Sequence, residues 1–229
     1  MAPEPEDRTA SLRGVRRLIA DRMMASLKES AQLTYHARAD VTDMMAWRAS
    51  LPANRRPGVE DCVISALASA LAQHPDFNAT VQAETVTIHA RIQVAVAIST
   101  PGGLVTPVLR DVQDLPIEQI ALRRRELVRR AQEGRLATSE MKGGTITISN
   151  LGLTAVQFFT PILNAGQAAI LGLGRITPEL RRAPDGEIVS SLALGLSLTC
   201  DHRWVDGDPS AKFLGDIIRG LEAMAPPAS

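Results

Sequence analysis

The sequence predicts an α+β domain built on one large mixed β-sheet, and three observations support this fold class. Several segments have helical periodicity, several shorter runs have the alternation or the flanking turns of strands, and no segment repeats along the chain. At 229 residues, the chain is long enough for one well-packed domain, or at most two small ones. We therefore expect one domain over residues 11–224, with a flexible linker remnant at 1–10 and a disordered tail at 225–229.

The helices are predicted from periodicity and from end signals. Apolar residues between Leu12 and Leu27 recur at intervals of three or four, which predicts an amphipathic helix with Ser11 at its N-cap. Asp40 or Thr42 is expected to cap the short helix that follows. A later segment is apolar on nearly every side, which predicts a buried helix, and another opens with proline and ends at glycine. The expected helices are 11–30, 43–51, 59–73, 116–134 and 210–224. Five arginines between 123 and 130 predict a solvated helix face.

Strands are predicted where apolar residues alternate with polar ones or where an apolar run is bounded by turns. Residues 101–103 are expected to form one such turn, and residues 184–187 a hairpin turn. The expected strands are 33–41, 85–89, 91–100, 104–110, 143–152, 168–176 and 191–200.

Composition argues against several classes of function. The 25 basic and 25 acidic side chains cancel, which argues against a nucleic-acid-binding protein, and a net charge of zero leaves self-association unopposed. No apolar run has the length of a signal peptide core or of a membrane span. Cys62 and Cys200 have no metal-ligand spacing and fit a reducing compartment. We expect a cytoplasmic protein that uses no metal ion, no nucleic acid and no membrane.

The densest group of ionisable residues follows the last predicted strand, in the stretch DHRWVDG at 201–207. A neutral His202 is a base near pH 7, and Asp206 is placed to orient the ring or to hold the turn through an arginine. Gly207 permits a backbone angle that other residues avoid. The residues alone leave a second interpretation equally open, in which His202 is merely hydrogen-bonded at a surface turn and Asp206 pairs with Arg203.

The stretch DHRWVDG resembles the DHRxxDG signature of the acyltransferase component of 2-oxo-acid dehydrogenase complexes, whose HxxxDG core is shared with chloramphenicol acetyltransferase. Other segments are similar to that family in the same order: GVRRLIADRM, HPDFNAT, GGLVTPVLRD, GGTITISNLG and FTPILNAGQAAILGLG. The resemblance covers the chain from about residue 12 to residue 223. It implies the catalytic, inner-core domain of such a protein, with the chloramphenicol acetyltransferase-like two-layer sandwich of a mixed sheet packed by helices.

The resemblance also implies the chemistry. His202 would be the general base that deprotonates the coenzyme A thiol, and Ser149 would donate a hydrogen bond to the oxyanion. Asp206 would hold the geometry of the site, with Arg16 or Arg22 as its ionic partner. Without the resemblance, Ser149 fits a residue that satisfies the backbone of a turn.

The substrate and coenzyme A channel is expected to include Asn78, Thr106, Trp204 and Gly207. Trp204 stands where the family usually has an aliphatic residue, and it could narrow the channel. The chain has no lipoylation segment, so the lipoyl group would arrive in trans.

The resemblance implies a homotrimer with a shared site, in which one subunit supplies the histidine and its neighbour supplies the serine. Such trimers can assemble further into cages of 24 or 60 subunits, which bind the dehydrogenase components and lipoyl domains. The segments TISNLG and FTPILN are more similar to the acetyl-transferring pyruvate and acetoin branch than to the succinyl branch. Two alternatives stay open: a free-standing O-acetyltransferase of the chloramphenicol type, and a structural core whose active site has decayed.

Overall fold

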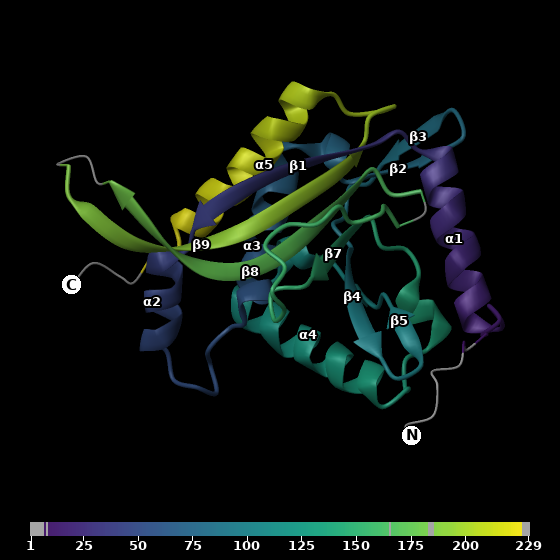
Figure 1. Ribbon diagram of the computed structural model, residues 1–229, viewed down its shortest axis with the longest axis horizontal. Helices are drawn as coiled ribbons and strands as arrows, with labels where there is room; N and C mark the ends of the chain where they lie inside the picture. Colours follow the sequence, from purple (N-terminus) through teal and green to yellow (C-terminus); the bar gives the residue numbers. More distant parts are fainter. Residues whose placement is uncertain (1–6, 8, 165, 183–185, 226–229) are drawn as a thin grey trace, which may run out of the picture.

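A mixed sheet forms the centre of the computed structural model, which describes residues 7, 9–164, 166–182 and 186–225. Its strands lie in the order β1 (Gln32–Asp40), β9 (Ile188–Asp201), β8 (Ala169–Arg182), β7 (Ile146–Asn150), β4 (Val94–Thr100) and β5 (Gly103–Val105), and β6 (Val108–Leu109) also pairs with β4. The pairings of β7 with β4 and with β8 are parallel, whereas the others are antiparallel. The predicted mixed sheet is therefore confirmed (Figure 1).

Two further strands lie outside this sheet. β2 (Ala79–Gln82) and β3 (Thr85–Ile88) pair with each other as an antiparallel hairpin. The sequence predicts β3 but not β2, because the four residues of β2 are too few for their alternation to stand out from the preceding segment. The hairpin follows the 3-10 helix η1 (Pro75–Phe77), and both are important for the site described below.

Helices form the second layer of the domain. They are α1 (Val15–Glu29), α2 (Thr42–Ser50), α3 (Val59–Gln73), α4 (Ile117–Gln132) and α5 (Gly207–Glu222), and the shorter 3-10 helices η2 (Val112–Asp114) and η3 (Thr138–Met141) lie on either side of α4 in the sequence. Among them, α3 packs between α4 and α5, while α5 also packs on β1 and α4 on β4. This is the predicted α+β sandwich.

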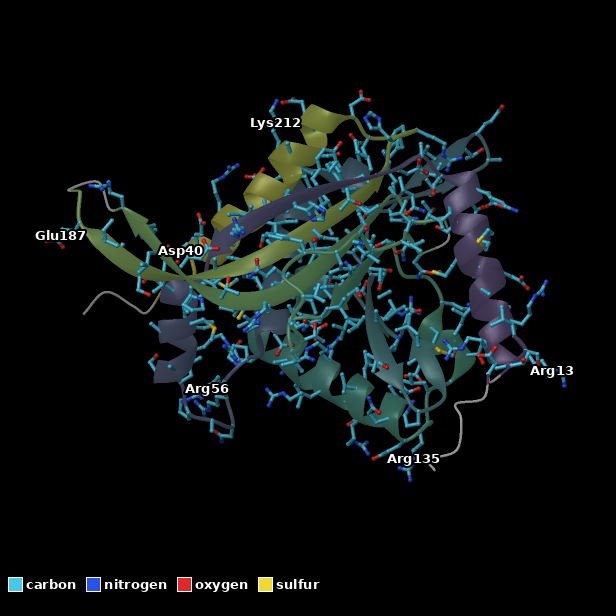
Figure 2. The ribbon with its side chains drawn as sticks, in the orientation of Figure 1. Arg13, Asp40, Arg56, Arg135, Glu187 and Lys212 are labelled. Carbon is cyan, nitrogen blue, oxygen red and sulfur yellow. The ribbon has the colours of Figure 1, made fainter. Side chains whose placement is uncertain are left out.

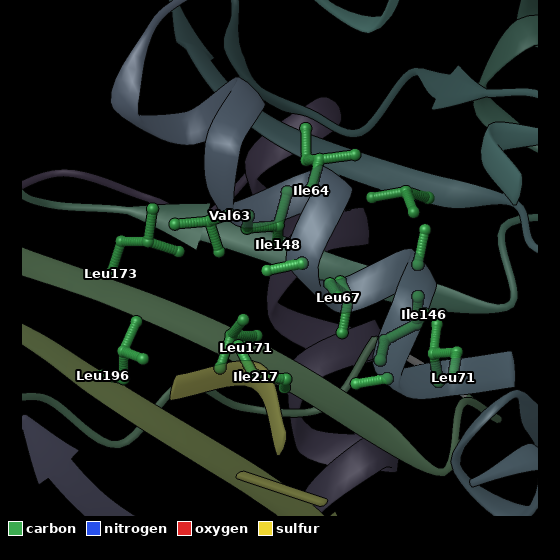
Figure 3. Packing of buried hydrophobic residues seen from close by; sticks show 14 of the residues in the cluster. Val63, Ile64, Leu67, Leu71, Ile146, Ile148, Leu171, Leu173, Leu196 and Ile217 are labelled. Carbon is green, nitrogen blue, oxygen red and sulfur yellow. The ribbon is translucent and has the colours of Figure 1, made fainter. Parts of the chain in front are cut away.

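The main core lies between α3 and the sheet. Val63, Ile64, Leu67 and Leu71 of α3 point toward apolar side chains of the central strands, as Figure 3 shows. Those partners are Ile146, Ile148, Leu171, Leu173 and Leu196, with Ile217 of α5 beside them. Because α3 is covered both by the sheet and by neighbouring helices, it is apolar on nearly every side, as predicted.

The opposite face of the sheet is covered by the loop that follows β7. A Cβ on Gly174 would lie 1.8 Å from the carbonyl oxygen of Gln157, and one on Gly195 would lie 2.1 Å from the same oxygen. Only glycine lets two backbones approach this closely. The loop is also held by Phe159, whose N–H donates to the Ser197 hydroxyl at 3.3 Å. The loop backbone therefore lies directly on β8 and β9, beside the strand that carries Ser149.

Two parts of the chain extend from this body, at opposite ends of Figure 1. At one end, the outer parts of β8 and β9 project as a long two-stranded arm. At the other end lies α1, which over the described part of the chain packs only sparsely against other helices and strands. Leu18, Met24 and Leu27 of α1 are about half exposed, at 52%, 53% and 49%. An amphipathic helix with an uncovered apolar face is typical of contact with another chain.

Charged side chains are spread around the molecule. Figure 2 labels acidic and basic examples from different elements, and these lie at separate places along the outline: Arg13, Asp40, Arg56, Arg135, Glu187 and Lys212. Many charges pair locally, as do Arg129 with Glu126 and Glu133 on α4. This intermixing agrees with the zero net charge of the sequence.

Several predicted details at helix ends are wrong. α1 begins at Val15 with Gly14 at the N-cap, so Ser11 is not the N-cap residue; Gly14 has φ 56°, a positive angle that glycine adopts more readily than other residues. The N-cap of α2 is Val41, although the Asp40 carboxylate does accept the Thr42 N–H at 3.1 Å.

Strand lengths also differ from prediction. β4 and β7 are shorter than expected, whereas β8 continues to Arg182 and β9 starts at Ile188, because these two strands pair with each other beyond the body of the sheet. The tip of the predicted hairpin turn at 184–187 lies largely outside the described residues.

Candidate active site

His202 immediately follows the last residue of β9. Its backbone N–H donates to the carbonyl of Ala31 at 2.8 Å, which fixes the start of the turn against the segment between α1 and β1. Its imidazole is 40% exposed. The buried strand therefore places an accessible imidazole at the end of the sheet.

The residues beside His202 hold the turn in shape. Asp201 is buried, and both its carboxylate oxygens accept from the Arg203 guanidinium at distances from 2.6 to 3.1 Å. The same carboxylate accepts the backbone N–H groups of Ala31 and Arg203. Burial opposes the charge of Asp201, but the Arg203 guanidinium and the two N–H donors outweigh it and lower the pKa of this carboxyl. Asp201 and Arg203, on either side of His202, thus bind each other and stabilise the turn.

Asp206 pairs with no arginine among the described residues and lies beside the ring of His202. Arg203 is bound to Asp201, so it does not pair with Asp206, and neither Arg16 nor Arg22 forms an ion pair with a described carboxylate. The Asp206 carboxylate is 85% exposed, and its Oδ1 lies 3.7 Å from Nδ1 of His202, beyond hydrogen-bond distance. Within one chain, Asp206 lies next to His202 without a hydrogen bond to its ring.

Gly207 is the first residue of α5, with Asp206 at the N-cap. It is not among the glycines with positive φ, so the predicted special backbone angle is wrong, and α5 begins three residues earlier than expected. A Cβ at Gly207 would lie 3.6 Å from the hydroxyl of Tyr35, an ordinary contact.

Ser149 lies near the end of β7. Ile146 and Ile148 point into the core, so strand alternation places Ser149 on the opposite face, beneath the loop that covers β8 and β9. It is half-buried and pairs in register with Ala97 of β4 and with Gly172 of β8. The expected strand at 143–152 is present as the shorter β7, with Ser149 one residue before its end.

His202 and Ser149 do not meet within one chain. Ser149 is in register with Gly172, and Gly172 with Ser197 on β9, which places Ser149 two strands from Ser197. His202 lies five positions beyond Ser197. With strands about 4.8 Å apart and about 3.3 Å per residue, the two Cα atoms are separated by about 19 Å. A base and an oxyanion donor must both lie about 3 Å from the reacting atoms, so one chain does not provide a complete site.

The candidate residues instead form two groups. Thr106 follows Val105, which pairs with Ile98, so Thr106 lies opposite Ala97, the residue that also pairs with Ser149. Ser149 and Thr106 therefore share one part of the sheet. His202, Asp206, Trp204 and Gly207 lie together at the far end of β9.

Asn78 is buried and fully used inside the protein. Its amide donates to the carbonyls of His89 and Arg91 at 2.6 and 3.1 Å, and its oxygen accepts from the Thr145 hydroxyl at 2.5 Å. These bonds fasten the β2–β3 hairpin to the segment that enters β7. Asn78 therefore has a structural role within the chain, and its place in the channel stays a prediction.

A cluster of buried charges behind Ser149 was missed by the sequence analysis. Arg124 of α4 donates to Asp61, which is fully buried, and to Glu60 at 3.0 Å. The Glu60 carboxylate also hydrogen-bonds the side chain of Asn150, the residue after Ser149. Burial raises the pKa of Glu60, with Arg124 and Asn150 opposing it. Arg124 is thus no part of a solvated face; two acids within the apolar segment 59–73 were the available signal.

An open cavity of about 800 Å³ lies beside the His202 turn. It is lined by Ala31, whose carbonyl holds His202, and by Arg203, together with Lys28, Glu29, Ser30, Val81, Gln82, Ala83 and Gly166. Among the described residues, no group of three histidine, cysteine or acidic side chains is arranged to hold a metal ion. No helix in the same part of the chain combines the length and apolarity needed to cross a membrane.

A mixed sheet packed by helices, with the sequence matched to it, is that of an acyltransferase catalytic domain. More narrowly, the chain belongs to the family of 2-oxoacid dehydrogenase acyltransferases, whose catalytic domain matches residues 4–227. The resemblance found in the sequence is thereby confirmed. So is the fold, since chloramphenicol acetyltransferase superimposes with a TM-score of 0.54 at 15% identity, covering 89% of this chain and 93% of that one.

Two curated relatives are similar over almost the whole chain. The dihydrolipoyllysine-residue acetyltransferase component of the acetoin cleaving system of Bacillus subtilis is 39% identical over 93% of this chain and 54% of its own length. The dihydrolipoyllysine-residue succinyltransferase component of the 2-oxoglutarate dehydrogenase complex of Haemophilus influenzae is 34% identical over 91% of this chain and 52% of its own. The chain spans about half the length of these relatives.

Two solved structures are similar over nearly their full length. The dihydrolipoamide acetyltransferase of Azotobacter vinelandii has a TM-score of 0.91 at 28% identity, covering 97% of this chain and 94% of that one. That structure concerns the role of a serine, a histidine and, four positions after the histidine, an asparagine in catalysis. The cubic core of the pyruvate dehydrogenase multienzyme complex has a TM-score of 0.91 at 27% identity, with the same coverage.

Proposed function

We propose that this domain transfers an acyl group, most simply acetyl, between a dihydrolipoyl thiol and coenzyme A. The observation that carries the proposal is the placement of an accessible His202 at the end of β9, in a fold and family of acyltransferases. Coenzyme A is then a substrate, and the lipoyl group arrives on another domain.

His202 acts as the general base. Its free imidazole nitrogen takes the proton of the coenzyme A thiol, and the thiolate attacks the carbonyl carbon of the acyl-dihydrolipoyl thioester. The hydroxyl of Ser149 donates a hydrogen bond to the oxyanion of the tetrahedral intermediate. When the intermediate collapses, the carbon–sulfur bond to the dihydrolipoyl group breaks, and the leaving thiolate takes the proton back from the imidazolium.

Asp206 contributes mainly to the shape of the turn, and less to stabilising a positive charge on His202. In the acetyltransferase of Azotobacter vinelandii, the residue four positions after the catalytic-study histidine is an uncharged asparagine. The corresponding spacing here gives Asp206, which is exposed and 3.7 Å from the imidazole. A polar side chain of this size, and not its charge, is therefore the shared requirement.

The active unit is a trimer with sites between subunits. Two observations support this proposal: the separation of about 19 Å between His202 and Ser149 within one chain, and the uncovered apolar residues of α1. A second copy that brings its serine to this histidine completes the site. The similarity to a cubic core supports further assembly into a 24-subunit cage, with a 60-subunit cage as the other closed form.

The acyl group and the cellular setting complete the proposal. An acetyl-transferring relative is 39% identical and a succinyl-transferring one 34%, which favours acetyl. The dehydrogenase components and lipoyl domains named for such complexes are the proposed partners. The two buried free thiols, Cys62 and Cys200, fit a cytoplasmic location.

Transfer of acetyl from acetyl-CoA to free dihydrolipoamide tests the proposal, with wild type beside His202→Ala. We expect the transfer rate of the variant to be lower by a factor of about 10²–10⁴, the usual contribution of general-base catalysis. Chloramphenicol as acceptor is the control for the O-acetyltransferase alternative. A wild type that assembles but acetylates neither acceptor would instead identify a structural core.

A further inference from the structure

Trp204 joins two separate hydrophobic clusters. Its ring packs against the main core and also against the small cluster of Ala79, Val81 and Ala168, which lies under the β2–β3 hairpin. Its indole N–H donates to the carbonyl of Asp76 in η1 at 2.9 Å. The side chain therefore spans from the turn after β9 to the segment that begins the hairpin.

The turn that carries His202 needs such a contact on this side. At its start, it is held by the buried Asp201, which accepts the backbone N–H of Arg203, and at its end by Val205, which is buried in the core. Trp204 itself donates its backbone N–H to the Asp201 carbonyl at 3.0 Å. Between these two ends, the His202 N–H binds the carbonyl of Ala31, and the indole adds a second contact, to η1.

The hairpin to which the indole binds is itself rigidly attached. Asn78, two residues after Asp76, uses every polar atom of its side-chain amide to bind the carbonyls of His89 and Arg91 and the Thr145 hydroxyl. The indole thus connects His202 to a support that is fastened to the segment leading into β7.

We propose that Trp204 is a positioning residue, which fixes the imidazole of His202 by tying its turn to η1 and the β2–β3 hairpin. The inference rests on the proposed function of His202. It differs from the expectation that Trp204 narrows the channel, and it is supported by the bound indole N–H and by the packing of the ring against apolar side chains of this chain.

The experiment uses Trp204→Phe, which removes the N–H donor but keeps a ring, and Trp204→Ala, which removes both. Displacement of a catalytic group by about 1 Å can cost about a hundredfold in rate. We expect kcat to fall by about 10–100-fold in Trp204→Ala, and by about fivefold in Trp204→Phe, the scale of one neutral hydrogen bond. If Trp204 acts only on the position of His202, the KM values for acetyl-CoA and dihydrolipoamide should change by less than about threefold.

The chain provides its own controls. The chain has one other tryptophan, Trp47 in α2, which is therefore the sole indole in both Trp204 variants. An unchanged fluorescence emission from Trp47 shows that the body of the domain is intact. Trp47→Phe is the matched variant, which should keep wild-type kcat. A kcat of Trp204→Phe between those of wild type and Trp204→Ala would show that the ring positions His202, and that the loss in Trp204→Ala is not caused by general misfolding.

A second readout does not depend on turnover. Diethyl pyrocarbonate modifies accessible neutral imidazoles, and mass spectrometry gives the rate at each histidine. In Trp204→Ala, the rate at His202 should rise severalfold, while those at His36, His74 and His89 stay constant. A wild type without acyltransferase activity would refute the proposed function, but the modification rate of His202 would still test whether Trp204 fixes its turn. The positioning role is overturned if the His202 rate is unchanged, or if kcat is kept while KM or acyl-chain preference changes.

Discussion

Mixing two inactive variants, His202→Ala and Ser149→Ala, should restore activity. Each variant lacks one of the two groups, so neither works alone. In a mixed trimer, however, one interface can combine the intact histidine of one chain with the intact serine of the next. The register places these residues about 19 Å apart within a chain, so only such an interface provides both.

The size of the effect follows from the symmetry of a ring of three. A site is intact when one chain carries the wild-type histidine and its neighbour the wild-type serine. For random 1:1 mixing, each condition holds for half of the chains, so about one quarter of the sites are intact. Every mixed trimer, whether it has two chains of one variant or two of the other, contains one intact site out of three. Isolated mixed trimers purified by two different tags should therefore have about one third of the wild-type activity, and mixed 24-subunit cages, whose trimers form at random, about one quarter.

The assay is acetyl transfer to dihydrolipoamide after co-expression of the two tagged variants and purification through both tags. The control is the same pair, expressed and purified separately and then combined without exchange of subunits, which should stay inactive. If mixed trimers are as inactive as the separate variants, the site lies within one chain, and the separation derived from the strand register does not describe the active enzyme.

Three further predictions concern individual side chains. Arg124→Met leaves the fully buried Asp61 without its guanidinium, and should lower the free energy of unfolding by about 3 kcal/mol in denaturant titrations at fixed protein concentration. Asp201→Asn should destabilise the protein at pH 7. Because the folded-state pKa of Asp201 is lowered, its stabilisation exists above the unfolded pKa of about 3.9 and is lost as the pH falls below it, so the difference in Tm from wild type should shrink in acid. Asp206→Asn should keep kcat within about tenfold of wild type, since the relative from Azotobacter vinelandii has asparagine at this spacing.

Each of these has a clear contrary result. An unchanged unfolding midpoint in Arg124→Met would mean that Asp61 is adequately satisfied by the N–H of Gly58 alone. A difference in Tm that grows in acid would contradict the direction of the Asp201 shift. Loss of more than a hundredfold in Asp206→Asn, with Asp206→Glu active, would show that the charge itself is required.

Local sequence patterns predict the helices well. The periodicity of α3 and the proline and glycine at the ends of α4 are short-range signals, and both helices lie within two residues of expectation. The start of α5 is less accurate, because the Asp206 N-cap and Gly207 are read in the sequence as part of a turn motif. Where two local signals compete, the pattern does not say which one the fold uses.

The sheet order and the arm of β8 and β9 depend on contacts far apart in the chain. Nothing local to Gly174 and Gly195 shows that a loop carbonyl lies against both of them. Similarly, β2 becomes a strand because it pairs with β3, and its four residues alone are too short a run to predict a strand. These features are decided by tertiary packing.

The candidate site was predictable as a set of residues but not as an arrangement. The motif identifies His202, and the resemblance identifies Ser149, yet only the register shows that they are far apart within one chain. Trp204 was assigned from its position beside His202, whereas its hydrogen bond to η1 requires the fold. Arg124 was assigned to solvent because its neighbours on α4 are solvated.

Cys200 gives the site a property that matters for its proposed substrates. The thiol lies two residues before His202, and burial raises its pKa to about 12. The oxidised lipoyl group is a cyclic disulfide, and a protein thiolate beside it would attack one of its sulfurs and form a mixed disulfide. Because the Cys200 thiol stays protonated and covered at neutral pH, the enzyme can handle sulfur nucleophiles without entering thiol–disulfide exchange with them.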